Sequence, residues 1–379
     1  MPVTIAVPRE SVTGERRVAL VPESVKKLTQ GGAKVVVESG AGAAAYYPDP
    51  EYAAAGAQVV TNRSEVLARG EIVLVVQPPV PAEIETFHPG AIVVGLLNPT
   101  RNLPAVRSLV KAHSTAFALE LLPRITRAQG MDALSSQATA AGYEAVLLGA
   151  ESTPKFLPML TTAAGTIRPA KALILGAGVA GLMAIATARR LGAVVEAYDV
   201  RRAAGEQVRS LGAKFLELAI NAEGTGGYAR ELTPGEKAQE QVMVSEAVAR
   251  ADLVVTTANI PGKKAPRLIG RDVVAKMRPG SVIVDLAAES GGNCEVTRPG
   301  ERVVENGVTV LGPTNLPSQI AFHSSQMYSH NLQAFLGLIL TPNGERAGAF
   351  EDEILQASLV VTEGTVRHAP TRDLLEAAV

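Results

Sequence analysis

The pattern of apolar and polar positions along the 379-residue chain defines two kinds of segment, which alternate. Short runs rich in β-branched residues predict strands, and the stretches between them carry apolar residues at helical spacing, as in Pro22–Thr29 and Leu103–Ala112. The strands predicted in the N-terminal third are Val3–Val7, Lys34–Val37, Ile72–Val76, Ala91–Gly95 and Thr115–Leu119. Strict alternation of strands and helices indicates a parallel, doubly wound sheet.

The middle third repeats this pattern with stronger signals. Its predicted strands are Ala172–Leu175, Val194–Tyr198, Phe215–Leu218, Leu253–Thr256, Val282–Asp285 and Val308–Leu311. The polar stretch Pro123–Gln137 separates the two regions, and a long helical pattern after Leu311 leads into a charged C-terminal segment. We therefore expect an α/β protein of two doubly wound Rossmann-type domains with mostly parallel sheets. The first would comprise residues 1–135 and 318–379, completed by the C-terminal segment, and the second residues 136–317.

Composition excludes several classes of function. The 36 basic and 37 acidic residues are nearly balanced, so we expect no nucleic-acid partner. The longest apolar stretch, Leu332–Leu340, is about half of what a bilayer span needs, so we expect no direct membrane insertion. A single cysteine, Cys294, and the absence of a signal-like N-terminus indicate a cytoplasmic protein. The five histidines show no ligand spacing, and we expect no metal site.

The segment KALILGAGVAGLMAIATARRLGAVVEAYD carries a dinucleotide-binding fingerprint. Gly176, Gly178 and Gly181 follow an apolar strand and open a helix, and Asp199 closes the next strand. The glycines allow a tight turn, close approach of the pyrophosphate and close packing of helix on strand, while the helix N-terminus attracts the anion. Asp199 would accept hydrogen bonds from the adenosine ribose and repel a 2′-phosphate, which favours NAD over NADP.

Each part of this fingerprint has a structural alternative. The glycines could serve only a tight strand-to-helix turn. Because the strand, the helix and the acid all occur together here, dinucleotide binding is the favoured interpretation. Arg201 and Arg202, next to the acid, could accommodate a 2′-phosphate and so weaken the preference for NAD.

Longer motifs resemble the superfamily shared by alanine dehydrogenase and the alpha subunit of proton-translocating nicotinamide nucleotide transhydrogenase. These motifs are VPRE, ERRVALVP, the Gly176 loop and DLAAESGGNCE. PRITRAQGMDALSSQ, GTGGYARE and TTANIPGKKAPRLI resemble the NAD(H)-binding component of the transhydrogenase in particular. The match runs essentially from end to end.

Alanine dehydrogenases of this superfamily use a lysine and a histidine to hold and protonate the keto acid. Here Gln77 stands at the apparent lysine position, and Leu96 and Leu97 occupy the region of the histidine. An apolar residue cannot transfer a proton to a substrate oxygen. The transhydrogenase reading is therefore favoured over the alternatives, an alanine or related amino-acid dehydrogenase and an NAD-binding sensor without chemistry.

The resemblance also implies roles for individual residues. Arg124 and Arg127 would reach the pyrophosphate or the carboxamide, Asp132 and Ser135 would orient the nicotinamide, and Gln129 would lie where the second nucleotide docks. A structural alternative is that Asp132 caps the helix that follows it. Further nucleotide contacts are expected from Ile125, Thr126, Val179, Val200, Arg201, Gly227, Tyr228 and Ala258. The glycine-rich segment Asn221–Gly235 would form a mobile lid, its alternative being an indifferent surface insertion.

A chain of this kind would work as one component of a larger enzyme. NAD(H) would bind here and NADP(H) on a partner beta subunit, while a membrane-spanning alpha subunit partner would carry the proton. The resemblance implies a homodimer on the cytoplasmic face of the membrane, held there through its partner subunits.

Overall fold

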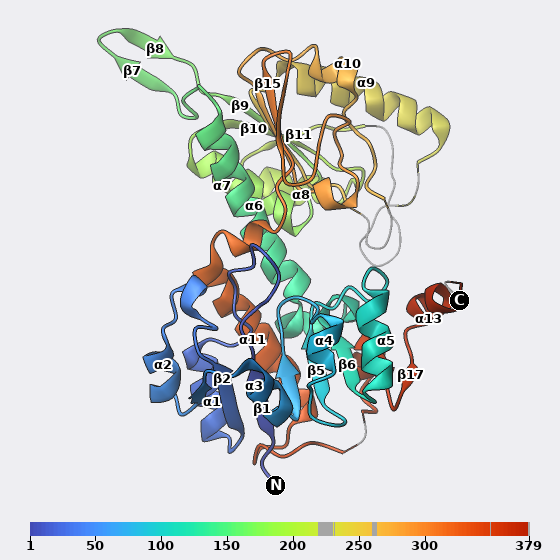
Figure 1. Cartoon of the computed structure of the whole chain (residues 1–379). Coiled ribbons are helices and arrows are strands. Elements are labelled where there is room, and N and C mark those ends of the chain that lie inside the picture. The colour runs from blue at the N-terminus through green and yellow to red at the C-terminus, as the bar shows by residue number, and fades with distance from the viewer. Residues whose placement is uncertain (219–229, 231, 260–263, 349, 378–379) are drawn as a thin grey trace. The chain divides into compact units, whose positions relative to one another are not determined.

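The computed structural model describes residues 1–218, 230, 232–259, 264–348 and 350–377. They form two compact units, which we call unit 1 (Met1–Gln137 and Pro317–Val379) and unit 2 (Ala138–Leu316). The chain therefore leaves unit 1 after the first third of its length and returns to it at the end, as the colours in Figure 1 show.

Unit 1 is built on a sheet that has eight strands among the described residues, in the order β17-β16-β6-β5-β4-β1-β2-β3. Its parallel strands are β1 (Thr4–Val7), β2 (Lys34–Glu38), β3 (Gln58–Val60), β4 (Ile72–Leu74), β5 (Ile92–Gly95) and β6 (Thr115–Ala118). The C-terminal segment adds β16 (Leu359–Thr362) and β17 (Thr365–Val366), which pair antiparallel. The chain runs from β1 outward to β3, then restarts at β4 on the other side of β1. The switch point of the sheet thus lies between β1 and β4.

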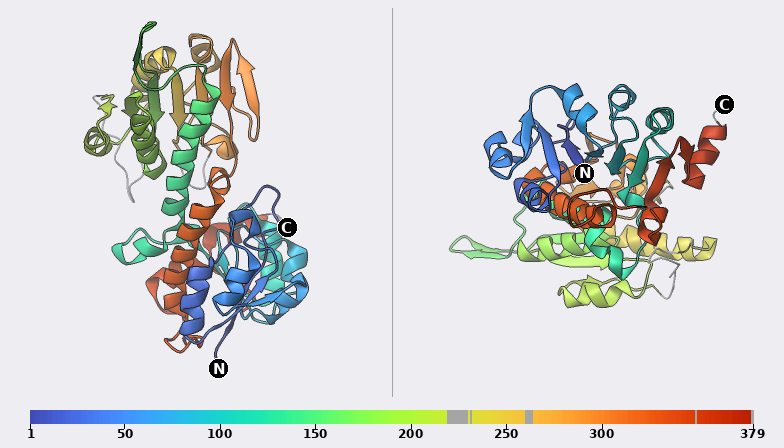
Figure 2. Two further views of the ribbon diagram at one scale, coloured as in Figure 1. Left: turned by 90° about the vertical axis from the view of Figure 1, so that its left-hand side faces the viewer. Right: turned by 90° about the horizontal axis from the view of Figure 1, so that it is seen from below.

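Helices cover both faces of this sheet. The short helices α3 (Arg63–Arg69) and α4 (Pro81–Ile84) and the helix α5 (Leu103–Lys111) pack on one face, while α1 (Pro22–Gln30) and α11 (Ala321–Ile339) lie side by side on the other (Figures 1 and 2). Successive strand residues enter different cores: Ile5 and Val7 face α11, while Ala6 faces α3. Burial on both faces explains why these strands are continuously apolar. The remaining helices of unit 1 are α2 (Asp49–Ala54), α12 (Glu353–Ser358) and α13 (Ala369–Ala377).

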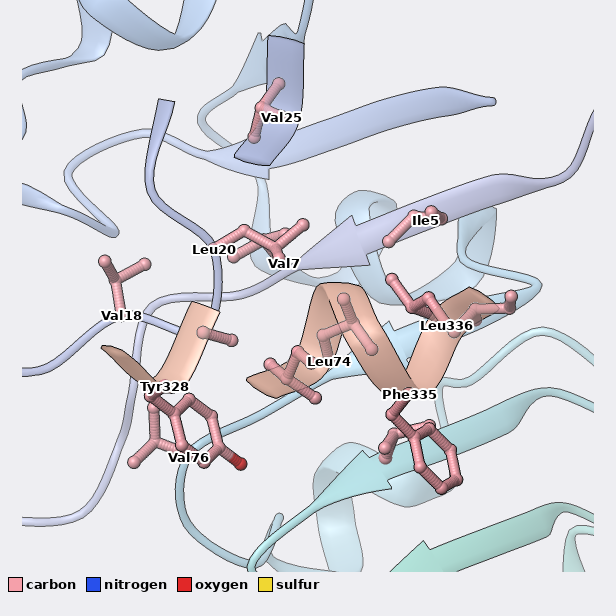
Figure 3. Close-up of a cluster of buried hydrophobic side chains, with 14 of the residues drawn as sticks. Ile5, Val7, Val18, Leu20, Val25, Leu74, Val76, Tyr328, Phe335 and Leu336 are labelled. Carbon is pink, nitrogen blue, oxygen red and sulfur yellow. The ribbon is translucent and has the colours of Figure 1, made fainter. Parts of the chain in front are cut away.

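The irregular segment 15–21, which precedes α1, is held by serines of the C-terminal return. Backbone N–H groups of Arg16, Val18 and Val21 donate to the hydroxyls of Ser318, Ser325 and Ser329 at 2.7, 3.0 and 3.0 Å. Val18 and Leu20 lie next to Tyr328 and the strand residues Val7 and Leu74 (Figure 3). The serines satisfy backbone groups that no strand partner satisfies, which is why α11 carries polar residues on its buried face.

Unit 2 has a second, seven-stranded sheet in the described part of the chain, in the order β11-β10-β9-β12-β13-β15-β14. It comprises β9 (Lys171–Leu175), β10 (Val194–Tyr198), β11 (Lys214–Phe215), β12 (Leu253–Thr256), β13 (Val282–Asp285), β15 (Val308–Leu311) and the antiparallel edge strand β14 (Arg302–Glu305). Its helices are α7 (Val179–Arg190), α8 (Ala204–Ser210), α9 (Pro234–Arg250), α10 (Arg271–Val274) and most of α6 (Ala133–Ser152). The chain runs from β9 outward through β10 to β11 and then restarts at β12 on the other side of β9. The switch point of this sheet therefore lies between β9 and β12.

These two mostly parallel sheets confirm the predicted fold class. The predicted strand Phe215–Leu218 is wrong in extent, because the strand is only Lys214–Phe215. Several short strands were not predicted. β3 and β14 are largely exposed edges, and the hairpin of β7 (Leu160–Thr162) and β8 (Gly165–Ile167) has no buried face, so none has a clear apolar period.

Candidate dinucleotide-binding site

The turn between β9 and α7 has the geometry of a phosphate-binding loop. Gly176 adopts a φ of 100°, and a Cβ on Gly181 would lie 1.9 Å from the carbonyl oxygen of Gly176. The packing of the chain itself therefore requires these two glycines. Gly178, at the N-cap of α7, has nothing within 4 Å of the place a Cβ would take. This leaves open space in front of the first amides of α7, beginning with Val179, which suits the pyrophosphate of a dinucleotide.

The segment after β12 packs against this loop and is held in place by hydrogen bonds. The Thr257 hydroxyl donates to the carbonyl oxygen of Gly176 at 3.1 Å, and the Ala258 N–H donates to the Asn293 side chain at 3.1 Å. Asn293 returns a hydrogen bond to the carbonyl of Ala258 at 2.8 Å. Ala258 is thereby fixed at the carboxyl end of β12, where open α/β sheets bind their ligands.

Asp285, at the end of β13, anchors the residues that hold Ala258. Its fully buried carboxylate accepts hydrogen bonds from the hydroxyls of Thr256 and Thr297 and from the backbone N–H groups of Asn293 and Cys294, at 2.7–3.0 Å. Sequence reasoning used this region only for its family resemblance. The signal it missed is an acid that ends an apolar strand and is followed six residues later by a glycine pair.

Asp199 lies at the end of β10, as the fingerprint requires. It accepts hydrogen bonds from the Ala177 N–H at 2.8 Å and from the guanidinium of Arg201 at 2.8 and 2.9 Å. The carboxylate is thus attached to the phosphate loop and faces the ligand side of the sheet. A small pocket opens beside it, lined in part by Val200, Phe215 and Leu218. Apolar side chains next to a carboxylate fit the adenine and ribose of a dinucleotide.

The other predicted residues belong to unit 1 and form a compact turn. Ile125 packs against the core, and Thr126–Met131 form a 3₁₀ helix on which Arg127 and Gln129 are exposed. Arg124, just before the turn, is also exposed. Arg127 forms ion pairs with Asp352 and Glu353 at 2.9 and 3.4 Å. This stretch of the chain therefore presents polar side chains on a backbone that is anchored to the core.

Asp132 and Ser135 are brought together at the start of α6. The Asp132 carboxylate accepts hydrogen bonds from the Ser135 N–H at 2.9 Å and from its hydroxyl at 2.6 Å. This is the N-cap arrangement that we considered as the structural alternative. Asn331 of α11 supports the same region by donating to the carbonyl of Gly130 at 2.9 Å and accepting from Ser136 at 2.6 Å. The sequence offered no signal for Asn331, because its partners are about 200 residues away.

At the switch point of unit 1 lies a buried polar cluster. The carboxylate of Glu15 pairs with Arg17 at 2.6 Å and accepts a hydrogen bond from the Gln77 amide at 2.8 Å. Burial alone would raise the pKa of Glu15, but Arg17 lowers it to about 2. Burial raises the pKa of Glu10 to about 7, although the N–H groups of Val76 and Gln77 donate to its carboxylate.

Two predicted contact residues, Gly227 and Tyr228, and most of the segment Asn221–Gly235 lie outside the described residues. In the portion of the chain that is described, no helix is long and apolar enough to cross a membrane.

Comparison with known families decides between the possible relatives of this fold. The model of the alanine dehydrogenase/PNT N-terminal domain matches residues 6–141, and that of the C-terminal domain matches residues 145–369. The chain belongs to the alanine dehydrogenase/PNT family. Within this family it is 45% identical to the first portion of the NAD(P) transhydrogenase alpha subunit of Rhodospirillum rubrum, over 96% of the chain and 97% of the relative. It is 28% identical to the alanine dehydrogenase of Mycobacterium tuberculosis over 96% of the chain and 94% of the relative.

Solved structures of family members agree. The transhydrogenase structure from Sinorhizobium meliloti matches with a TM-score of 0.85 and 43% identity, covering 96% of this chain and 98% of that one. An L-alanine dehydrogenase matches with a TM-score of 0.83 and 27% identity, covering 99% and 100%. The fold is thus common to both branches of the alanine dehydrogenase/PNT family, while sequence identity places the chain with the transhydrogenase alpha subunits.

Proposed function

We propose that this chain is the NAD(H)-binding subunit of a proton-translocating NAD(P) transhydrogenase. The observation that carries the proposal is the phosphate loop at Gly176–Gly181 with Asp199 beside it. Bound nicotinamide would exchange a hydride directly with NADP(H) on a partner subunit. The chain's own task is then to bind NAD(H), orient it and exclude water, which calls for no general acid or base at the reacting atoms.

The polar cluster of unit 1 supports this reading over amino-acid dehydrogenation. A keto-acid substrate needs a cation for its carboxylate and a proton donor for its carbonyl oxygen. Arg17, the buried cation, is already neutralised by Glu15, and Gln77 supplies an amide without a titratable proton. Leu97 is buried in the apolar core between the sheet and helices α3, α4 and α5, and Leu96 packs against the core on the other face, under α1 and α11.

We assign roles in NAD(H) binding on the same basis. Gly176, Gly178, Val179 and Gly181 would hold the pyrophosphate, Asp199 with Val200 and Arg201 the adenosine, and Ala258 the segment between them. Arg124, Arg127, Asp132 and Ser135 would orient the nicotinamide, with Ile125 and Thr126 as backbone contacts. Gln129, exposed on its turn, would lie at the junction with NADP(H).

The assembly follows from the same proposal. Relatives whose names describe them as the first portion of a divided alpha subunit imply further subunits in their enzymes. We infer an NADP(H)-binding beta subunit and a membrane-spanning alpha subunit partner, with this chain as a homodimer on the cytoplasmic face of the membrane.

Mixing the chain with a purified NADP(H)-binding transhydrogenase component tests the activity. Hydride transfer from NADH to an NADP⁺ analogue is expected without added organic substrate or metal. Gln129→Asn should slow transfer far more than it weakens NADH binding. NADH oxidation by the chain alone, dependent on pyruvate and ammonia, would instead identify an alanine dehydrogenase.

A further inference from the structure

Asn293 lies in the turn that follows β13, and its side-chain amide joins two other segments of unit 2. The residue is fully buried. Its side-chain oxygen accepts a hydrogen bond from the Ala258 N–H at 3.1 Å, and its side-chain nitrogen donates to the carbonyls of Ala258 and Pro266 at 2.8 and 2.7 Å. One side chain therefore connects Ala258, which follows β12, to Pro266, which precedes α10.

Ala258 lies directly against the phosphate loop. The place that a Cβ would take on Gly176 is 3.2 Å from the Ala258 nitrogen and 2.5 Å from Thr257 Oγ1. Thr257 is bound to the same turn, because its N–H donates to the carbonyl of Leu175 at 2.8 Å and its hydroxyl to that of Gly176 at 3.1 Å. These contacts place Ala258 at the carboxyl ends of β9 and β12, the two strands beside the switch point, where sheets of this type bind a dinucleotide.

The hydrogen bonds of Asn293 decide what Ala258 can offer to a ligand. Ala258 is only partly buried, yet its N–H and its carbonyl are both paired with Asn293. Neither backbone group then needs water or a ligand as its partner. The contact that Ala258 leaves for a nucleotide is therefore its methyl group, which is apolar.

The backbone of Asn293 is held in place independently of its side chain. Its N–H donates to the buried carboxylate of Asp285 at 2.8 Å, and its carbonyl accepts from the N–H groups of Leu268 and Ile269 at 2.8 and 3.0 Å. A side chain on a fixed backbone loses little conformational freedom when it binds a neighbouring segment. Asn293 can thus impose a position on Ala258.

We propose that Asn293 is a positioning residue for the dinucleotide and that it acts through Ala258. It holds Ala258 against the phosphate loop before the nucleotide arrives, so binding does not have to order this part of the crevice. Asn293 itself needs no contact with the nucleotide. The inference rests on the proposed function only in that NAD(H) binds at the phosphate loop, and it does not depend on hydride transfer or on partner subunits.

Titration of purified variants with NADH tests this role. Asn293→Ala removes three hydrogen bonds to Ala258 and Pro266 and should weaken NADH binding by about tenfold. Thr297→Val is the matched control, because its hydroxyl donates to the same Asp285 carboxylate, at 2.7 Å, instead of to Ala258. This control should lower the melting temperature but keep the NADH affinity. Equal losses of affinity in both variants would mean that Asn293 only stabilises the fold and would overturn the proposal.

A double-mutant cycle tests whether Asn293 acts through Ala258. Ala258→Gly removes the methyl group and should weaken NADH binding by about threefold. If the two residues act together, the double variant should bind NADH about as weakly as Asn293→Ala alone. Independent losses, which multiply to about thirtyfold, would contradict the proposal.

Hydrogen exchange in the wild-type protein keeps the test decisive if the variants do not fold. The Ala258 amide, followed by NMR, should be protected in the free protein and should change little when NADH is added. Rapid exchange that is slowed only by NADH would show that the nucleotide orders this segment, and the proposal would fail.

The same measurements separate this inference from the proposed function. If the wild-type protein does not bind NADH, both are wrong. If it binds NADH but transfers no hydride with a partner component, the proposed function fails while the role of Asn293 stands. If transfer occurs and Asn293→Ala binds NADH as the wild-type protein does, the role of Asn293 alone is refuted.

Discussion

The Asp199 carboxylate lies 2.8 Å from the guanidinium of Arg201, two residues further along the chain. The acid expected to receive the adenosine ribose is therefore paired with the only type of side chain that could also hold a 2′-phosphate through two parallel hydrogen bonds. Removing the acid changes two things together, because it abolishes the repulsion of a 2′-phosphate and releases Arg201.

We predict that Asp199→Asn weakens NADH binding by about tenfold, as expected for the loss of charged hydrogen bonds worth about 1.5 kcal/mol. NADPH should bind several-fold more tightly than it does to the wild-type protein, because Arg201 can then turn to the phosphate. Fluorescence titration with both nucleotides measures the two changes. Adding Arg201→Ala should abolish the gain for NADPH, and an unchanged affinity for NADPH in Asp199→Asn would refute the competition.

Two glycines of the phosphate loop should respond differently to the same substitution. Gly178→Ala adds a methyl group to open space at a φ of −78°, so the melting temperature should change little, while NADH binding should weaken by about tenfold or more. Gly181→Ala would place a Cβ 1.9 Å from a carbonyl oxygen and should cost about 3 kcal/mol or more. Melting curves and NADH titrations distinguish the two. If Gly178→Ala binds NADH normally, the pyrophosphate does not lie there.

Asn331 is predicted to position the turn that carries Gln129. Asn331→Ala removes the hydrogen bond to Gly130 and should lower the rate of hydride transfer by about tenfold, with a smaller effect on NADH affinity. Ser329→Ala on the same helix is the matched control, because its hydroxyl supports Val21 instead. It should lose stability but keep the transfer rate. Equal losses of rate in both variants would mean that Asn331 only stabilises the helix packing.

Stability should fall as the pH rises from about 5 to 8. Burial raises the pKa values of Glu10 and Glu120 to about 7, so both are protonated in the folded protein at pH values where the unfolded chain is already ionised. The stability they contribute is full below the unfolded pKa near 4.5 and is lost as the pH passes through 7. Each raised pKa accounts for at most about 3 kcal/mol.

Urea unfolding at several pH values measures this slope. Glu10→Gln and Glu120→Gln should each flatten it, whatever their effect on stability at pH 5. Glu15 has the opposite shift, to about 2, so the stability that it contributes rises between about pH 2 and 4.5 and is constant above that range. A slope that is the same in the wild-type protein and both variants would show that these carboxylates ionise freely.

Features that depend on neighbouring residues in the chain could be predicted from the sequence, because the interactions that determine them are local. A buried parallel strand is apolar along its length, and the tight turn between β9 and α7 needs Gly176 and Gly181, so both could be predicted from the sequence alone. That Gln77 and Leu97 themselves carry no ionisable proton could be read from the sequence in the same way.

Features that depend on distant pairing could not be predicted. Nothing in the sequence indicates that Glu15 contacts Gln77 or that Asn331 contacts Gly130. The short strands β3, β7 and β14 were missed because they lie at exposed edges, where alternation of apolar residues is weak. The expected roles in nucleotide binding remain predictions.

The serines of α11 that hold segment 15–21 also bear on the order in which the protein can be made. Each of these serines is about 300 residues away in sequence from the residue that it holds. The core of unit 1 therefore cannot close until the ribosome has released residues beyond Ser329. Unit 2 is continuous in sequence and can complete its sheet earlier. During synthesis, the apolar strands of the first 120 residues must therefore wait without their covering helix. Chaperone dependence and aggregation of nascent chains should accordingly arise from the N-terminal part of unit 1.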